Sequence, residues 1–250
     1  MSSEAPLPTQ TDPTAQPRIP LSRERVLAAA IELADEGGIE SLTMRKLAQA
    51  LGVEAMSLYN HVANKGDIVE AIVDRIVSEI ELPADGDWET AIRTYAIDVH
   101  EALLLHPWSC SLVMSPSMNF AEPNARMRYI EWMLGRLREA GFSAELAYHG
   151  YHALDSHILG FTLWEVGYSA GARALPDLGA AFRRQFPVDR YPYIAEHMGE
   201  HSKKSSRADG EFGFGLDLIL DGLEEIRTTR PGSRARTDTP RARPRRRPSC

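Results

Sequence analysis

Hydrogen-bonding side chains crowd one short stretch of the sequence, from Ser57 to His61, where a core helix would carry leucine and isoleucine. Hydroxyl and imidazole groups suit phosphate oxygens, and the amide of Asn60 suits a phosphate or a base edge. Arg45, in the apolar-periodic run before this stretch, has the guanidinium that can pair with two acceptor atoms of guanine. This chemistry is that of a nucleic-acid surface, and the alternative is an ordinary solvated helix face.

Two histidine clusters suggest metal binding instead. His149, His152 and Asp155 recur at i, i+3 and i+6 of a predicted helix, and the segment from His197 to His201 (HMGEH) matches the H-x-x-E-H pattern of zinc peptidases. The second cluster lies in a Pro- and Ser-rich region without a long helix or a third ligand at a sensible distance. We therefore predict no catalytic residue, no metal and no cofactor, and keep an all-helical metal-binding protein or enzyme as the alternative.

The elements around the polar stretch are predicted to be a helix, a tight turn and a second helix. Residues 44–51 gather their leucines on one face, Thr43 can cap the free N–H groups, and Gly52 can close the helix in a left-handed conformation. Leu58 continues the buried set in the second helix, and the small Ala48 allows the two helices to cross closely. This is the helix-turn-helix pattern, whose second helix enters the major groove of DNA.

Residues 41–76, SLTMRKLAQALGVEAMSLYNHVANKGDIVEAIVDRI, resemble the DNA-binding domain of the TetR family of bacterial repressors. Residues 212–225, FGFGLDLILDGLEE, resemble the last core helix of its tetracycline-repressor branch. The resemblance implies a repressor, not an enzyme, that binds a double-stranded operator as a homodimer and is released by a small hydrophobic effector. The residues then expected at the DNA are Thr43, Arg45, Ala55, Met56, Ser57, Tyr59, Asn60, His61 and Lys65.

The sequence departs from the tetracycline repressors at two places. Those repressors use Gln-Pro at the start of the recognition helix, where this chain has Ala55-Met56, so its operator should differ. Their metal-chelating histidine falls near Val113 in a rough alignment. The effector is therefore not expected to be a tetracycline–Mg²⁺ chelate.

The net charge of −7 divides unevenly along the chain. From Arg227 onward there are nine arginines and one acid, Asp238, so bulk charge does not draw the rest of the chain to DNA. The tail either acts as a solubilising extension or adds sequence-independent attraction to DNA. No apolar run is long enough to span a membrane, no signal peptide is evident, and two cysteines, Cys110 and Cys250, fit a reducing cytoplasm.

An all-α, two-domain protein is predicted. Residues 1–21 and 229–250 should be disordered, 22–67 should form the three-helix head, and 68–228 the ligand-binding and dimerisation domain. Ser22 and Asn64 are expected N-caps, and Asp67 is placed as a capping-box acid. Helices are expected to follow at 67–82, 88–105, 108–115, 123–140, 143–170 and 211–228, with one short helix between 171 and 210.

Methionine and tryptophan are unusually frequent in the predicted helices of the large domain. A core built for stability alone would use more leucine and isoleucine, so we predict an adaptable small-molecule pocket there. A non-inducible architectural protein, with these side chains filling a closed core and the tail coating DNA, is the other possibility. The expected ligand-binding residues are His100, Trp108, Met114, Met118, Tyr129, Trp132, Met133, His157, Trp164 and Tyr168.

Overall fold

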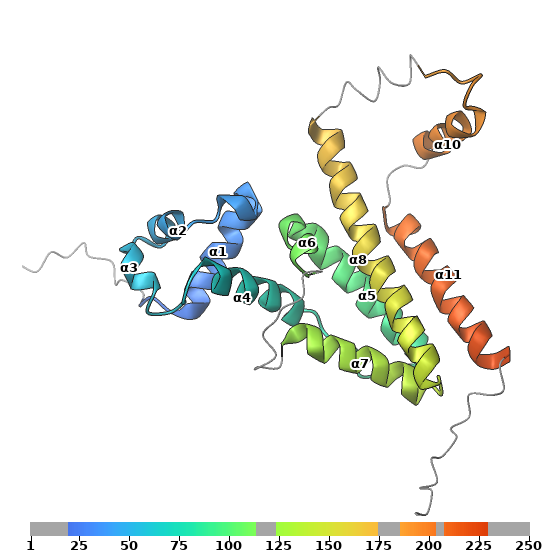
Figure 1. Cartoon of the computed structure of the whole chain (residues 1–250), viewed down its shortest axis with the longest axis horizontal. Coiled ribbons are helices and arrows are strands. Elements are labelled where there is room, and N and C mark those ends of the chain that lie inside the picture. Colours follow the sequence, from blue (N-terminus) through green and yellow to red (C-terminus); the bar gives the residue numbers. More distant parts are fainter. Residues whose placement is uncertain (1–19, 114–123, 175–185, 204–207, 230–250) are drawn as a thin grey trace, which may run out of the picture. The chain divides into compact units, whose positions relative to one another are not determined.

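The computed structural model describes residues 20–113, 124–174, 186–203 and 208–229. Every regular element in these ranges is a helix and no strand occurs in them, so the predicted all-α fold is confirmed (Figure 1). The chain divides into two compact units, Met1–Val69 and Glu70–Cys250. The predicted disordered termini and the expected pocket residues Met114 and Met118 lie outside the described residues.

The first unit holds helices α1 (Arg23–Gly37), α2 (Met44–Leu51) and α3 (Ala55–Leu58), with the short 3₁₀ helix η1 (Ile39–Ser41) between the first two. Ser22 and Thr43 cap α1 and α2 as predicted, because their hydroxyls accept from the backbone N–H of Arg25 and Lys46. Gly52 closes α2 at φ 67°, the left-handed conformation expected of it. The predicted helix, turn and second helix are therefore present, although α3 has a single helical turn.

Helix α4 (Lys65–Ser78) begins in the first unit and ends in the second. The Asn64 side chain accepts from the Asp67 N–H at 3.0 Å, as expected of its N-cap. The helix was expected to continue to Pro83, but the Ser78 hydroxyl donates to the Arg75 carbonyl at 2.8 Å and the helix ends there. The chain turns after Ser78, and Ile80 and Leu82 pack against the core of the second unit.

The second unit is a bundle built around the long helix α8 (Ala144–Ala174), which packs against α5, α7 and α11 (Figure 1). Gly150 of α8 permits a close approach to α11, since a Cβ there would lie 3.2 Å from the Leu223 side chain. The predicted helix at 108–115 is a 3₁₀ turn followed by one short helix. The elements are α5 (Trp88–Leu105), η2 (Pro107–Ser109), α6 (Cys110–Val113), α7 (Ala125–Glu139), α8, α10 (Pro192–Lys203) and α11 (Ala208–Thr229).

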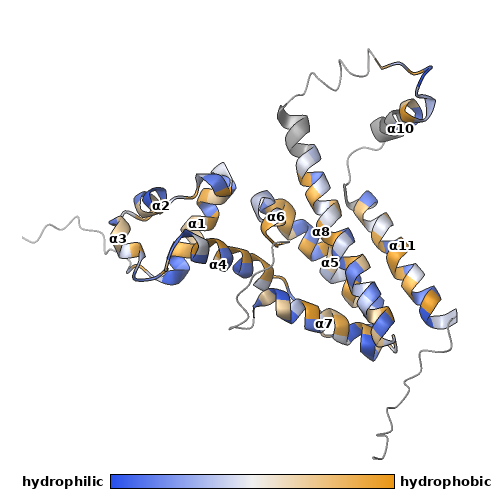
Figure 2. Cartoon of the chain, viewed as in Figure 1, coloured by the Kyte–Doolittle hydropathy of each residue, from blue (hydrophilic) through white to orange (hydrophobic). Residues whose placement is uncertain are grey.

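Helix α11 carries apolar residues on more than one side (Figure 2). Phe212, Leu216 and Leu220 recur at every fourth position and are buried against the bundle. Phe214 and Leu218 point the other way and are 66% and 60% exposed in the single chain. The helix therefore has a second apolar face that its own bundle leaves uncovered.

Candidate nucleic-acid interface and internal pockets

The polar stretch of the first unit lies at the surface, and its one large apolar residue lies inside. Leu58 is fully buried, whereas Met56 and Tyr59 are 75% and 47% exposed. Of the other predicted contact residues, Thr43, Arg45 and Asn60 are exposed, and Ala55, Ser57 and His61 are half-buried. Leu58 anchors the single turn of α3, so the neighbouring side chains face solvent and can reach a partner.

The backbone after this turn is fixed by Arg23, a residue that the sequence analysis did not single out. Its guanidinium donates to the His61 carbonyl at 2.9 Å and forms an ion pair with Asp67 at 3.1 Å. The Asp67 carboxylate also accepts from the Ala63 N–H at 2.9 Å, in place of the expected capping-box contact to Asn64. The Arg23 guanidinium and then the Ala63 amide hold the pKa of Asp67 below its usual range.

Lys65 contacts the backbone of its own unit. Its ammonium donates to the Ile39 carbonyl of η1 at 3.5 Å, and the residue is half-buried. The structure thus directs Lys65 toward the protein's own backbone, which a periodicity argument could not foresee because the two residues are 26 positions apart.

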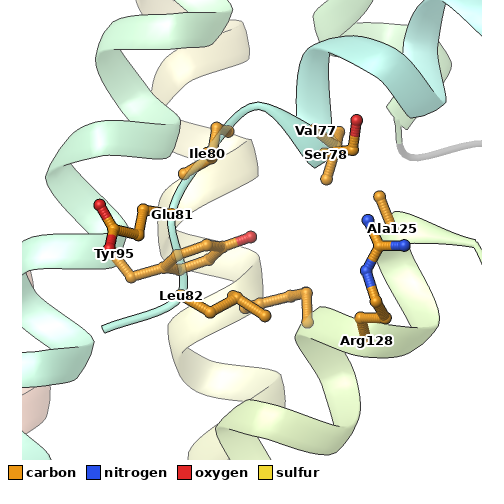
Figure 3. A pocket seen from close by; sticks show the side chains of 9 residues that line it. Val77, Ser78, Ile80, Glu81, Leu82, Tyr95, Ala125 and Arg128 are labelled. Carbon is orange, nitrogen blue, oxygen red and sulfur yellow. The ribbon is translucent and has the colours of Figure 1, made fainter. Parts of the chain in front are cut away.

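An outer pocket of about 260 Å³ opens in the second unit where the chain after α4 meets α5 and α7 (Figure 3). Ile80 and Leu82 supply apolar wall, and the Tyr95 ring reaches into the space (Figure 3). Glu81 and Arg128 place one carboxylate and one guanidinium on its polar border. Its lining consists of Val77, Ser78, Ile80, Glu81, Leu82, Tyr95, Ala125, Arg128 and Tyr129.

A smaller inner cavity of about 30 Å³ shares Val77, Tyr95 and Tyr129 with the outer pocket. The Tyr95 and Tyr129 rings are stacked, with centroids 4.9 Å apart. Aliphatic side chains of α5, α6 and α8 form the remaining apolar wall, and two charged residues, Arg126 and Asp155, also line the cavity. The two spaces are therefore neighbours, and the wall that they share, here called the Tyr95–Tyr129 partition, is partly aromatic.

The charged pair of the inner cavity ties three helices together. The Arg126 guanidinium donates to the Asp155 carboxylate at 3.2 Å and to the Val113 carbonyl of α6 at 3.0 Å. The Tyr151 hydroxyl lies 3.5 Å from the same carboxylate. Burial, and after it the charge of Asp155, raises the pKa of Tyr129 well above its usual value, so its hydroxyl stays protonated at neutral pH.

Among the described residues, Tyr129 is the one predicted ligand-binding residue that lines these two pockets. His100 and His157 line neither pocket; the Phe212 ring stacks on both, with centroid distances of 4.1 and 5.0 Å. Other predicted members divide between the core and the surface. Met133 is fully buried, Trp132 is half-buried against the core, Trp108 is half-buried in η2, and Trp164 and Tyr168 are each 52% exposed.

The histidine clusters do not assemble into a metal centre in the described part of the chain. His149 and His152 are exposed and contact the Tyr148 ring, while Asp155 is engaged by Arg126. No group of three or more His, Cys, Asp or Glu residues among those described could hold a metal ion. The side chain of His201 lies outside the described set.

Comparison with known proteins places both units in one family. Residues 26–72 match the model for bacterial regulatory proteins of the tetR family, and residues 82–227 match the tetracyclin repressor-like C-terminal domain. The chain belongs to the TetR family. The HTH-type transcriptional repressor DrrR1 of Streptomyces coeruleorubidus is 32% identical over 235 residues, covering 89% of this chain and 84% of that protein.

Two further TetR-family relatives extend the comparison. The class D tetracycline repressor protein of Escherichia coli is 31% identical over 210 residues, which cover 82% of this chain and 89% of the repressor. The crystal structure of ActR from Streptomyces coelicolor in complex with (S)-DNPA superposes with a TM-score of 0.64 at 26% identity, covering 82% of this chain and 98% of ActR.

This TetR-family chain is a ligand-responsive, DNA-binding transcriptional repressor, as the sequence predicted. Its relatives are named as transcriptional regulators, which agrees with the prediction that it is not an enzyme and gives no support to the metal-enzyme alternative. In the ranges that the structure describes, no helix combines the length and apolar character needed to cross a membrane.

Proposed function

We propose that this repressor acts in the cytoplasm and binds a palindromic operator as a homodimer, through residues 22–67 of each chain. The observation that carries the proposal is the outward display of Met56 and Tyr59 around a fully buried Leu58. Met56 and Ala55 suit the methyl group of thymine, Arg45 suits guanine, and the hydroxyl and imidazole groups suit phosphates. Thr43 also caps α2, because its hydroxyl oxygen accepts from the Lys46 N–H, and its O–H can still donate to a phosphate.

The second apolar face of the bundle supports the homodimer. On α8, Trp164 and Tyr168 stack at 5.5 Å while remaining half-exposed, and on α11, Phe214 and Leu218 are exposed. Exposed apolar side chains on two helices that pack against each other are typical of a protein interface. Packing α8 and α11 against their symmetry mates would cover it, and a two-fold axis would set two recognition helices about 34–36 Å apart, one turn of B-DNA.

Residues 68–228 are proposed to bind the effector, with the outer pocket and inner cavity as its site. The support is that both spaces touch Val77 near the end of α4, the helix that the two units share. The Asp74 carboxylate of α4 also accepts from the Ala125 N–H of α7 at 2.6 Å. A ligand releases DNA only by binding one arrangement of the heads more tightly than the other, and α4 is the element through which that difference would act.

The relatives indicate what kind of effector to seek. ActR has been solved with a small organic compound, and the tetracycline repressors are named for one. An organic effector is therefore proposed for this chain, and its chemistry is considered below.

Selection of bound duplexes from a random DNA pool tests the operator proposal directly. The expected product is an inverted repeat with half-site centres one helical turn apart, bound by two chains. Enrichment of an asymmetric site, or of no site above an unselected pool, would contradict it. The variant Arg190→Ala, altered at an exposed arginine of the second unit, should select the same repeat as the unaltered protein.

A further inference from the structure

The Tyr129 hydroxyl is a buried polar group without a hydrogen-bond partner among the described residues. Tyr129 is 6% exposed, and it lines both the outer pocket and the inner cavity. Buried hydroxyls are nearly always paired, because an unpaired one has lost its bonds to water without replacement. This hydroxyl therefore lacks a partner among the described residues, and it belongs to a side chain that lines both spaces.

The hydroxyl can act as a donor throughout the physiological pH range. Burial raises the pKa of both Tyr129 and its stacked neighbour Tyr95, so neither phenol ionises near neutrality. A protonated phenol in an apolar cavity can donate a hydrogen bond, so a ligand that binds there should supply an acceptor. A carbonyl oxygen is a compact acceptor.

The charges at the cavity already compensate one another. Arg126 and Asp155 are paired at 3.2 Å, and their side chains are 34% and 16% exposed. A ligand carboxylate would compete with Asp155 for the Arg126 guanidinium and would be repelled by the Asp155 carboxylate. A ligand cation would compete with Arg126 for Asp155 and would be repelled by the Arg126 guanidinium. A group without formal charge avoids both costs.

The volume and walls of the outer pocket indicate which kind of ligand scaffold carries that acceptor. Its volume of about 260 Å³ lies close to the lower end for small-molecule sites, and the stacked Tyr95–Tyr129 pair gives it an aromatic wall. Flat, apolar ring systems pack well on such a wall.

We propose that the effector is an uncharged, planar, largely apolar molecule whose carbonyl oxygen accepts a hydrogen bond from the Tyr129 hydroxyl. Its ring system occupies the outer pocket, and its oxygen reaches past the Tyr95–Tyr129 partition toward the inner cavity. This inference rests on the proposed effector site in the second unit. It goes beyond that proposal by naming the ligand class and the atom that recognises it.

The test compares three probes of one ring skeleton by calorimetric titration of the full chain. 9-Fluorenone has the acceptor oxygen, fluorene lacks it, and 9-oxofluorene-4-carboxylate adds a negative charge. Each is titrated into the unaltered protein and into Tyr129→Phe, which removes a single oxygen atom. Tyr148→Phe is the matched control, because that tyrosine is 57% exposed on α8 and lines neither pocket.

The expected result is that fluorenone binds more tightly than either other probe and loses about tenfold or more in affinity in Tyr129→Phe, the loss of one buried hydrogen bond. Fluorene should bind equally to both proteins, and Tyr148→Phe should bind all three as the unaltered chain does. The inference is overturned if Tyr129→Phe leaves fluorenone binding unchanged, if the carboxylate binds most tightly, or if fluorenone does not bind at millimolar concentration.

Two further measurements separate folding and DNA binding from ligand recognition. Because the hydroxyl is unpaired, Tyr129→Phe without ligand should have a thermal midpoint equal to or above that of the unaltered protein; a clear fall would mean that the hydroxyl is satisfied internally and would count against the inference. Operator binding is measured without any probe. If it fails while the probe pattern holds, the repressor mechanism is wrong and the ligand class stands.

Discussion

The Asp67 carboxylate forms an ion pair with the Arg23 guanidinium, with 3.1 Å between oxygen and nitrogen. This pair joins the first residue of α1 to the first turn of α4. Because Arg23 also donates to the His61 carbonyl, the pair holds the end of the polar stretch against α1. The position of the polar stretch thus depends on an ion pair between two residues that are far apart in sequence. Neither residue is among the predicted DNA contacts.

Replacing Asp67 with asparagine should lower the stability of the first unit by about 0.5–1 kcal/mol at pH 7, since both partners are partly solvated. The pKa of Asp67 is lowered in the folded state, so the stabilisation is complete above the ordinary aspartate pKa and is lost as the pH falls through the folded value. Urea unfolding of the two proteins should therefore differ at neutral pH, and the difference should disappear as the pH falls through the folded pKa of Asp67. A constant difference at all pH values would show that the charge is irrelevant, and Asp85→Asn, at an exposed loop carboxyl, is the control.

Arg45 should contribute to operator affinity without contributing to the fold. Its side chain is exposed, so Arg45→Ala should cost about 1–3 kcal/mol in specific binding with an unchanged unfolding midpoint. Fluorescence anisotropy with a labelled operator measures this. Arg190→Ala, which removes the same charge from the second unit, should bind as the unaltered protein does.

Leu218→Glu should convert the homodimer to monomers. The side chain is 60% exposed in the single chain and belongs to the uncovered apolar face of α11, where a carboxylate would be desolvated on association. Sedimentation velocity is expected to show a single-chain species, and operator affinity should fall with it. Leu105→Glu is the matched control at another exposed leucine, 75% exposed on α5; if both variants remain dimeric, α11 is not at the interface.

Gly215 of α11 should resist substitution more than Gly222 of the same helix. A Cβ on Gly215 would lie 2.4 Å from His157 Cε1, whereas nothing lies within 4 Å of one on Gly222. Gly222→Ala should stabilise the chain by about 0.5–1 kcal/mol through backbone entropy. In Gly215→Ala the new methyl group should displace the His157 imidazole, which then loses its 2.9 Å hydrogen bond to the Phe212 carbonyl. The loss of this hydrogen bond offsets the gain in backbone entropy.

The background variant His157→Ala isolates this clash. With the imidazole absent, Gly215→Ala should stabilise the chain as Gly222→Ala does, and thermal melts of the four combinations give the coupling energy. Equal gains from Gly215→Ala in both backgrounds would show that the imidazole has room to move without cost.

Local signals in the sequence identified the parts of the fold that are set locally. The left-handed Gly52, the caps Ser22, Thr43 and Asn64, and the stripe of α11 all follow from residues within one or two turns of one another. The end of α4 did not, because the i+4 isoleucine repeat continues to Ile80 although the backbone turns after Ser78. There the packing of Ile80 and Leu82 on the second unit outweighed the helical period.

The pocket was the least predictable feature for the same reason. Met133 and Trp132 have the residue types of an adaptable pocket, yet Met133 is fully buried and Trp132 is held by its indole N–H, which donates to the Pro83 carbonyl at 3.1 Å. The cavity is lined by Tyr129, which was among the predicted residues, and by the Arg126–Asp155 pair, whose partners lie on different helices. The spacing of residues along one helix does not indicate which side chains of another helix they contact.

The shared walls of the two spaces have a pharmacological consequence. A compound too short to pass the Tyr95–Tyr129 partition could fill the outer pocket and exclude the natural inducer while leaving the deeper hydroxyl untouched. Such a molecule would behave as an antagonist that keeps the regulated promoter silent. Small changes in ligand length, at constant ring chemistry, would then separate inducers from anti-inducers of this repressor.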